Sequence, residues 1–134
     1  MATLIDSSLW IDFTRAKSPE ALKRFVAPFI LDADAYLAEP IIFELLRFAT
    51  DPETELLQAH FKTFPVLTTP PGLWRSGAEL GRRCRKKGLV AGGLDLLIAT
   101  VAIEHDAELV TFDEDFLKIA ECSKLRVRWL VRPK

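Results

Sequence analysis

Five acidic side chains of this 134-residue chain stand at positions from which carboxylates can do chemistry. They are Asp6, Glu44, Asp95, Asp113 and Asp115. Asp6 and Asp113 directly follow short apolar runs, and Glu44 is the single acid of an apolar segment, where an ionised side chain is costly to bury. If the runs are parallel strands, their carboxyl ends meet at one edge of a sheet, where ligands collect. We therefore expect the acids to converge at that edge.

Converging carboxylates need a counter-charge, because they repel one another and raise one another's pKa. No basic residue adjacent in the sequence neutralises this group. A divalent cation relieves the repulsion, and Mg²⁺ and Mn²⁺ prefer oxygen ligands shared with water and substrate phosphates. Such ions activate a water and stabilise the attacking and leaving oxygens of an in-line displacement. The pattern therefore indicates metal-assisted hydrolysis of a phosphodiester.

Each acid also has a plainer interpretation. Asp6, Asp95 and Asp113 are good N-cap residues for the helices that follow them. Glu44 can pair with Arg47 three residues later, an interaction worth only a few tenths of a kcal/mol. These interpretations explain each acid singly, but they do not explain why all of them gather at one edge.

The net charge of −1 hides a basic segment. Residues 72–93 carry a balance of +5, which leaves −6 for the rest of the chain. Its cationic run consists of Arg82, Arg83, Arg85, Lys86 and Lys87. These side chains either bind the phosphates of a nucleic acid or form the solvated end of a helix, where the dipole favours cations. Gly88 is a plausible residue to end that helix.

Other chemical groups offer no rival site. His60 and His105 are isolated, so we expect both to be structural or solvated. Cys84 and Cys122 have neither a metal-binding spacing nor the density of a disulfide framework, so we expect two reduced, buried thiols in a cytoplasmic protein. No apolar run reaches the roughly 18 residues that span a membrane, and the N-terminal residues do not resemble a signal peptide.

Strands and helices alternate along the chain. Apolar runs predict strands at 3–5, 35–38, 64–68, 109–112 and 127–131, the last at an edge of the sheet. Helices are predicted at roughly 9–13, 20–30, 41–50, 51–62, 70–87, 94–104 and 115–120, and we expect 41–50 to be buried nearly all round. This alternation is typical of an α/β fold with a mainly parallel central sheet of four to five strands. We expect one three-layer α/β/α sandwich spanning 1–134.

Four motifs resemble the PIN-domain ribonucleases, and among them the VapC toxins of bacterial and archaeal VapBC toxin–antitoxin pairs. The motifs are Leu4-Ile5-Asp6-Ser7-Ser8, Glu44, Gly93-Leu94-Asp95-Leu96-Leu97-Ile98-Ala99, and Leu109-Val110-Thr111-Phe112-Asp113-Glu114-Asp115-Phe116. The resemblance implies a PIN-like fold and an acidic quartet of Asp6, Glu44, Asp95 and Asp113. It makes Asp115 an auxiliary acid, leaves Asp113 and Asp115 as alternative direct metal ligands, and gives Ser7 and Thr111 a supporting role.

The same resemblance implies a catalytic cofactor and partners. The expected activity is Mg²⁺- or Mn²⁺-dependent cleavage of single-stranded or looped RNA. The expected partners are the RNA substrate, a second copy of the chain in a homodimer, and a VapB-like antitoxin that covers the site. No membrane partner is expected. Trp10, Phe13 and Phe48 are candidates for the dimer seam or, equally, for the core.

Three other classes of protein fit less well. Phosphatases of the haloacid-dehalogenase type and receiver domains require acids near the first strand that Asp6-Ser7-Ser8 does not supply. Structure-specific DNA nucleases usually carry more acids and more helices. The presence of all four acids argues against a degenerate PIN scaffold that only binds RNA or protein. Such a scaffold, and a free-standing PIN nuclease that acts on RNA or DNA without an antitoxin, are the two alternatives to a VapC-like toxin.

Overall fold

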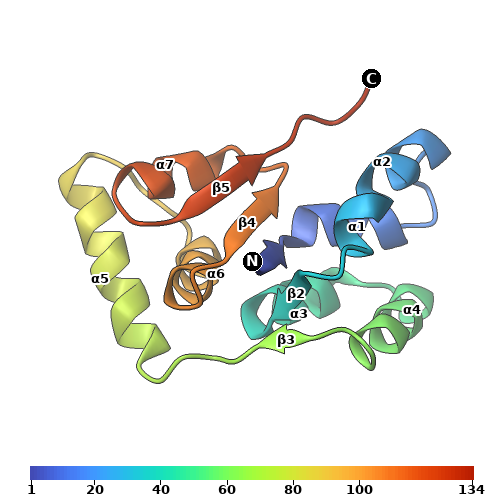
Figure 1. Ribbon diagram of the computed structural model, residues 1–134, viewed down its shortest axis with the longest axis horizontal. Coiled ribbons are helices and arrows are strands. Elements are labelled where there is room, and N and C mark those ends of the chain that lie inside the picture. Colours follow the sequence, from blue (N-terminus) through green and yellow to red (C-terminus); the bar gives the residue numbers. More distant parts are fainter.

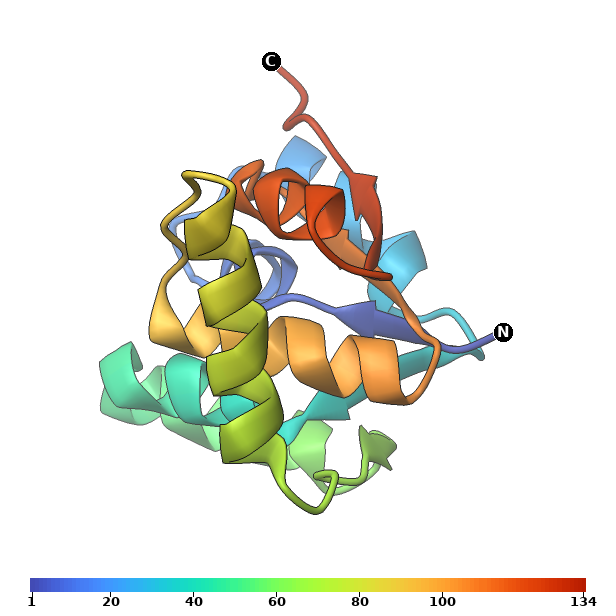
Figure 2. The same ribbon diagram turned by 90° about the vertical axis from the view of Figure 1, so that its left-hand side faces the viewer.

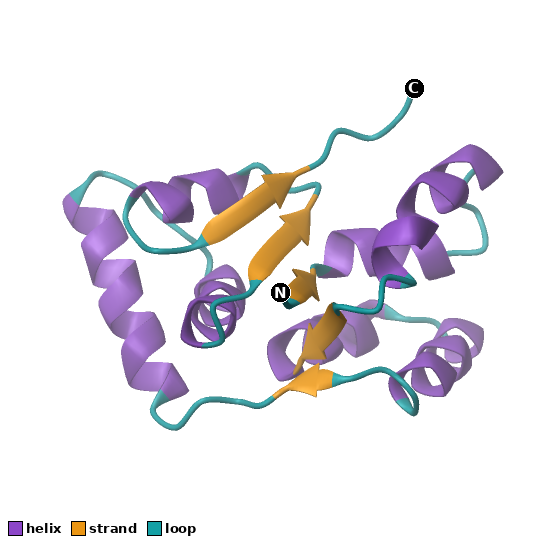
Figure 3. Cartoon of the chain, in the orientation of Figure 1, coloured by secondary structure: helices purple, strands orange, loops and turns teal.

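A five-stranded parallel sheet forms the centre of the protein, which is described here over residues 1–134 from a computed structural model (Figures 1 and 3). Its spatial order is β3-β2-β1-β4-β5, and every neighbouring pair is parallel. The strands are β1 (Thr3–Ile5), β2 (Ala35–Ala38), β3 (Val66–Leu67), β4 (Glu108–Thr111) and β5 (Arg126–Trp129). The chain moves outward from β1 in both directions, so the strand order reverses there. Ligand sites form at such switch points.

Seven helices cover the sheet on both sides, which confirms the predicted three-layer α/β/α fold (Figure 1). They are α1 (Ser7–Thr14), α2 (Glu20–Ile30), α3 (Glu39–Phe48), α4 (Asp51–Phe61), α5 (Leu73–Lys86), α6 (Gly93–Glu104) and α7 (Asp115–Glu121). Helices α1, α2 and α4 lie on one side, and α5, α6 and α7 on the other. Helix α3 contacts α1, α4 and α6. Figure 2 shows α5 lying across α6.

Local sequence signals explain where several helices begin and end. Thr50 caps α4 through a capping box with Glu53, in which each side chain bonds the other residue's backbone N–H. Gly88 follows α5 with φ of +78°, in the left-handed region that glycine adopts at low cost. None of the helices is both long enough and apolar enough to cross a lipid bilayer.

The expectation that the segment 41–50 is buried nearly all round is wrong. Only one face of α3 is buried, through Pro40, Ile41 and Leu45. Phe43 and Phe48 are 55% and 75% exposed, respectively. The segment is apolar all round because one face packs in the core while the other presents aromatic side chains on the surface.

Trp10 is at the centre of an aromatic cluster in the core. It is fully buried, and the rings of His60 and Phe64 meet it edge-on at centroid distances of 5.6 and 4.9 Å. His105 bonds the backbone oxygen of Thr68 at 2.8 Å through Nε2. Both histidines are structural, as expected, and Trp10 belongs to the core rather than to a seam.

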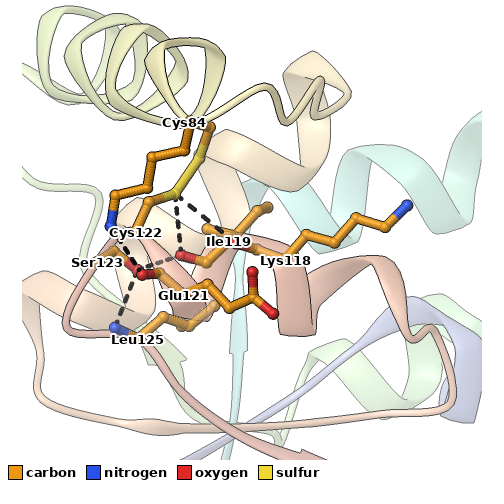
Figure 4. The surroundings of a disulfide bond; sticks show 8 residues. Cys84, Lys118, Ile119, Glu121, Cys122, Ser123 and Leu125 are labelled. Carbon is orange, nitrogen blue, oxygen red and sulfur yellow. Dashed lines mark hydrogen bonds between the residues drawn. A yellow bond between two sulfur atoms is a disulfide. The ribbon is translucent and has the colours of Figure 1, made fainter.

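The expectation of two reduced thiols is wrong, because Cys84 of α5 and Cys122 at the end of α7 form a disulfide (Figure 4). Their Cα atoms lie 5.8 Å apart, within the normal range for a disulfide. Beside it, Lys87 Nζ donates to the carbonyl oxygen of Glu121 at 3.2 Å. A separation of 38 residues in sequence carries no information about this contact, which arises only when α5 and α7 pack on the same side of the sheet.

We predict that reducing the disulfide lowers the free energy of unfolding by about 2 to 4 kcal/mol, because the crosslink restricts the unfolded chain. Urea unfolding with and without dithiothreitol measures this effect. The Cys122→Ser variant should match the reduced wild type and should not respond to dithiothreitol. Equal unfolding midpoints for wild type with and without dithiothreitol would contradict a stabilising disulfide between Cys84 and Cys122.

Candidate metal centre

Asp6 occupies the carboxyl end of the central strand and begins α1. It is 3% exposed, and its Oδ2 accepts hydrogen bonds from Thr111 Oγ1 at 2.7 Å and Ser8 Oγ at 2.8 Å. Its N-cap bond from the backbone N–H of Ser8 also ends on Oδ2, at 3.4 Å. Burial raises the pKa of Asp6, against the effect of the hydrogen bonds from Thr111 and Ser8, and the charge of Glu44 raises it further. Because Oδ2 takes these bonds, Oδ1 is the oxygen left for a ligand.

Glu44 is held toward this group by Ser7, whose hydroxyl donates to Glu44 Oε1. The bond joins α1 to α3 across the carboxyl edge of the sheet. The alternative pairing of Glu44 with Arg47 is wrong, because no ion pair forms between them. The Arg47 guanidinium instead lies over the ring of Phe48, 4.3 Å from its centroid. Ser7 therefore has the supporting contact expected of it.

Asp95, Asp113 and Asp115 form the tightest group of acids. Each offers one carboxylate oxygen, and these oxygens lie within 4.8 Å of one another. Asp95 is in the first turn of α6, whose N-cap is Gly92 and has no side-chain cap bond. Asp113 accepts the N–H of Asp115 at 2.9 Å. Asp95 is thus no N-cap, and the auxiliary acid Asp115 belongs to the same group of three acids as Asp113.

The pKa of Asp95 shows that the acids act on one another. It is raised to about 7, first by burial and then by the negative charges of Asp113, Asp6, Glu44 and Asp115, in that order. The other four predicted acids therefore all act electrostatically on Asp95. The N-cap interpretation accounts for Asp6 alone, and Asp6 combines capping with membership of the cluster.

A cavity of about 340 Å³ opens beside the acids. Four of the acids line it, together with two arginines and one further acid that the sequence analysis missed. These three residues are Arg15, Arg132 and Asp12. Arg132 comes from the chain end, and Asp12 is 120 positions away, so no sequence spacing could have connected them.

The predicted RNA-binding cations lie elsewhere. None of Arg82, Arg83, Arg85, Lys86 and Lys87 lines the cavity of the acids. They end α5, where the disulfide joins the helix to the end of α7, and Lys87 is bonded to Glu121 there. Their role in binding RNA stays a prediction.

The donor set suits a divalent cation. It consists only of carboxylate oxygens, in a group whose mutual repulsion already raises the pKa of Asp95. Oxygen-only sites of this kind suit Mg²⁺, Mn²⁺ and Ca²⁺ rather than softer metals. The acidic cluster can therefore hold a divalent metal ion.

Comparison with known proteins agrees with the fold. Residues 3–121 match the model of the PIN domain family. Ribonuclease VapC11 of Mycobacterium tuberculosis is 33% identical over 128 residues, which cover 92% of this chain and 95% of that protein. Ribonuclease VapC19 of the same species is 30% identical, over 81% of this chain and 86% of that protein.

Solved structures show the same fold. A VapBC2 structure from Rickettsia felis, bound to a promoter DNA fragment, contains a chain that is 18% identical with a TM-score of 0.76. The match covers 97% of this chain and 99% of that chain. The chain therefore belongs to the PIN domain family and, within it, to the group that includes the VapC ribonucleases.

We predict that without divalent metal the protein becomes less stable between pH 5 and pH 8. The pKa of Asp95 is near 3.8 when the chain is unfolded and about 7 when it is folded, so the folded state holds a proton that the unfolded state has released. Raising the pH removes this proton from Asp95 and therefore lowers the free energy of unfolding. Because the carboxyl of Asp95 is partly exposed and solvent screens its charge, we expect the loss to be about 1 to 2 kcal/mol.

Urea unfolding in EDTA at the two pH values measures this loss. Asp95→Asn should lose less stability than wild type across the interval, although the raised pKa of Asp6 leaves a smaller slope of the same sign. If the free energy of unfolding depends on pH equally in wild type and in Asp95→Asn, the raised pKa of Asp95 does not cause the loss of stability.

Proposed function

We propose that the protein is a VapC-like endoribonuclease that cleaves single-stranded or looped RNA with the help of Mg²⁺ or Mn²⁺. The observation that carries the proposal is the convergence of Asp6, Glu44, Asp113 and Asp115 on Asp95, seen in the raised pKa of Asp95. The names of the VapC relatives support the ribonuclease activity. Because cellular RNA is the proposed substrate, we also propose a cytoplasmic location.

Each acid has a role in this proposal. Asp6, Asp95 and Asp113 hold the metal, directly or through water, and Asp115 supplements them. The chemistry that the bound ion supplies is activation of a water for attack on phosphorus and stabilisation of charge on the leaving oxygen. Glu44, held by Ser7, binds the metal or orients the attacking water. Thr111 fixes the carboxylate of Asp6 and accepts the N–H of Asp113 at 2.9 Å, so one hydroxyl positions two of the acids.

We also propose that the protein binds a VapB-like antitoxin and forms a homodimer. Structural neighbours of the chain come from VapBC complexes. Large apolar side chains stand on the surface, among them Phe43, Phe48 and Trp74, which is 76% exposed. Surfaces of this kind favour a protein partner. Co-purification with the product of a neighbouring reading frame tests the antitoxin, and light scattering of the purified chain tests the dimer.

We predict that the wild type cleaves a labelled structured RNA in Mg²⁺ or Mn²⁺ and loses this activity in EDTA. Asp6→Asn should reduce the rate by at least about 100-fold, because it removes a buried charge from the metal site. Thr111→Val, which keeps the shape but removes the bond to Asp6, should give a smaller loss. Cleavage that survives both EDTA and Asp6→Asn would contradict a metal nuclease, and absence of cleavage with retained RNA affinity would favour a binding scaffold.

The basic end of α5 supplies a separate prediction. If these cations bind RNA phosphates, Lys86→Ala combined with Lys87→Ala weakens RNA binding and flattens its dependence on salt, by about 0.7 in log–log slope for each phosphate that is no longer neutralised. Fluorescence anisotropy over a KCl series measures both quantities. Unchanged affinity and slope would assign these side chains to the solvated end of the helix.

A further inference from the structure

Arg132 lies at the rim of the acidic cavity and is held there by two contacts. Its Nε donates to Asp12 Oδ2 at 2.7 Å, and its guanidinium carbon lies 4.4 Å from the centre of the Phe112 ring. The chain that carries it is also anchored, since the N–H of Leu130 donates to the carbonyl oxygen of Thr111 at 2.8 Å and the indole of Trp129 donates to that of Phe112 at 3.1 Å. An arginine near the chain end is thus fixed in place.

The anchoring leaves most of the guanidinium free. Asp12 uses only Nε, and neither of the two terminal nitrogens of Arg132 donates a hydrogen bond within the protein. The side chain of Asp12 is 11% exposed and that of Arg132 is 50% exposed. Arg132 also lines a second cavity of about 460 Å³ beside the first, with Asp113 common to both. The free N–H donors of Arg132 therefore face two cavities that Asp113 also lines.

A cation at the rim of the cavity reduces the repulsion between the carboxylates and an approaching phosphate. A phosphodiester that approaches five converging carboxylates is repelled by them until a positive charge offsets the field. Arginine binds phosphate through two parallel N–H bonds and keeps its charge at all relevant pH values. Arg15 lines the same cavity, but its side chain has no hydrogen bond or ion pair that fixes it. Arg132 is the cation already held in position.

We propose that Arg132 binds a backbone phosphate of the nucleic-acid substrate beside the acidic cluster, and that Asp12 is its positioning residue. The inference rests on the proposed function only in taking RNA as the substrate. The competing role is purely structural, in which Arg132 does no more than neutralise the buried Asp12. The two roles differ in their effect on RNA binding, because a structural pair affects stability alone.

The experiment measures binding of a fluorescein-labelled single-stranded RNA by anisotropy, in CaCl₂ and over a series of KCl concentrations. A gel confirms that the RNA stays intact. Arg132→Gln should weaken binding about 5- to 10-fold and reduce the slope of log K against log[KCl] by about 0.7, the value for one phosphate of a single strand that is no longer neutralised. Arg132→Lys keeps the charge but removes the fork, so it should bind more weakly than wild type with an unchanged slope.

Arg128 provides the matched control. It is also half exposed, in the same terminal segment, and pairs with Glu108 at 2.8 Å, but the cavity it lines contains none of the five acids. Arg128→Gln therefore removes the same charge and a similar ion pair elsewhere, and should change affinity less than 2-fold. Thermal unfolding of each variant confirms that binding is measured on folded protein.

Asp12 is tested through a double-mutant cycle. In an Asp12→Ala background, Arg132→Gln should change RNA affinity less than 2-fold, because the arginine is no longer positioned. A merely structural role of Asp12 would leave the effect of Arg132→Gln on affinity as large as in wild type, and that result would overturn the positioning role.

The proposal is overturned if Arg132→Gln matches Arg128→Gln in both affinity and salt slope, or if the wild type binds no RNA. These outcomes are separable from those of the cleavage assay. Wild-type cleavage with no effect of Arg132→Gln leaves the nuclease intact and removes only this phosphate site. Binding that depends on Arg132 without any cleavage supports the phosphate site and contradicts the nuclease.

Discussion

Repulsion among carboxylates at the carboxyl edge of the sheet is the constraint that the rest of the structure has to satisfy. Burial and neighbouring negative charge raise the pKa of Asp95 to about 7, so its ionised form is disfavoured in the folded chain. The fold supports this arrangement with strands on both sides of β1 and with hydroxyls aimed at individual acids. Thr111 and Ser8 bond Asp6, and Ser7 bonds Glu44. The repulsion among the acids lowers the free energy of unfolding, and the buried hydrophobic core raises it.

The sequence allowed the acids and the strands to be predicted because both are local signals. A short apolar run followed by an aspartate marks a strand end, and parallel strands bring such ends together. Asp6 and Asp113 were found in this way, and they follow the carboxyl ends of the neighbouring strands β1 and β4. The end of α5 was also predicted from the sequence, because Gly88 can adopt a positive φ at low cost.

Features that depend on contacts across the chain could not be predicted in the same way. The bond between Arg132 and Asp12 joins residues 120 positions apart, and the disulfide joins helices whose packing no spacing reveals. Composition also misled the interpretation of α3, because an apolar side chain such as Phe48 looks the same in sequence whether it faces the core or the surface. Sequence patterns identified the acids that gather at the edge of the sheet better than they identified the residues at the rim of the cavity.

The disulfide has a topological consequence for the acidic cluster. The bond closes a covalent ring from Cys84 to Cys122, and that ring contains Asp95, Asp113 and Asp115 but neither Asp6 nor Glu44. The centre is therefore bipartite: a cyclic part supplies three acids, and the linear part before it supplies the other two. While the bond is intact, a single backbone cut inside the ring leaves one covalently linked molecule. The five acids come together only where the ring packs against β1 and α3.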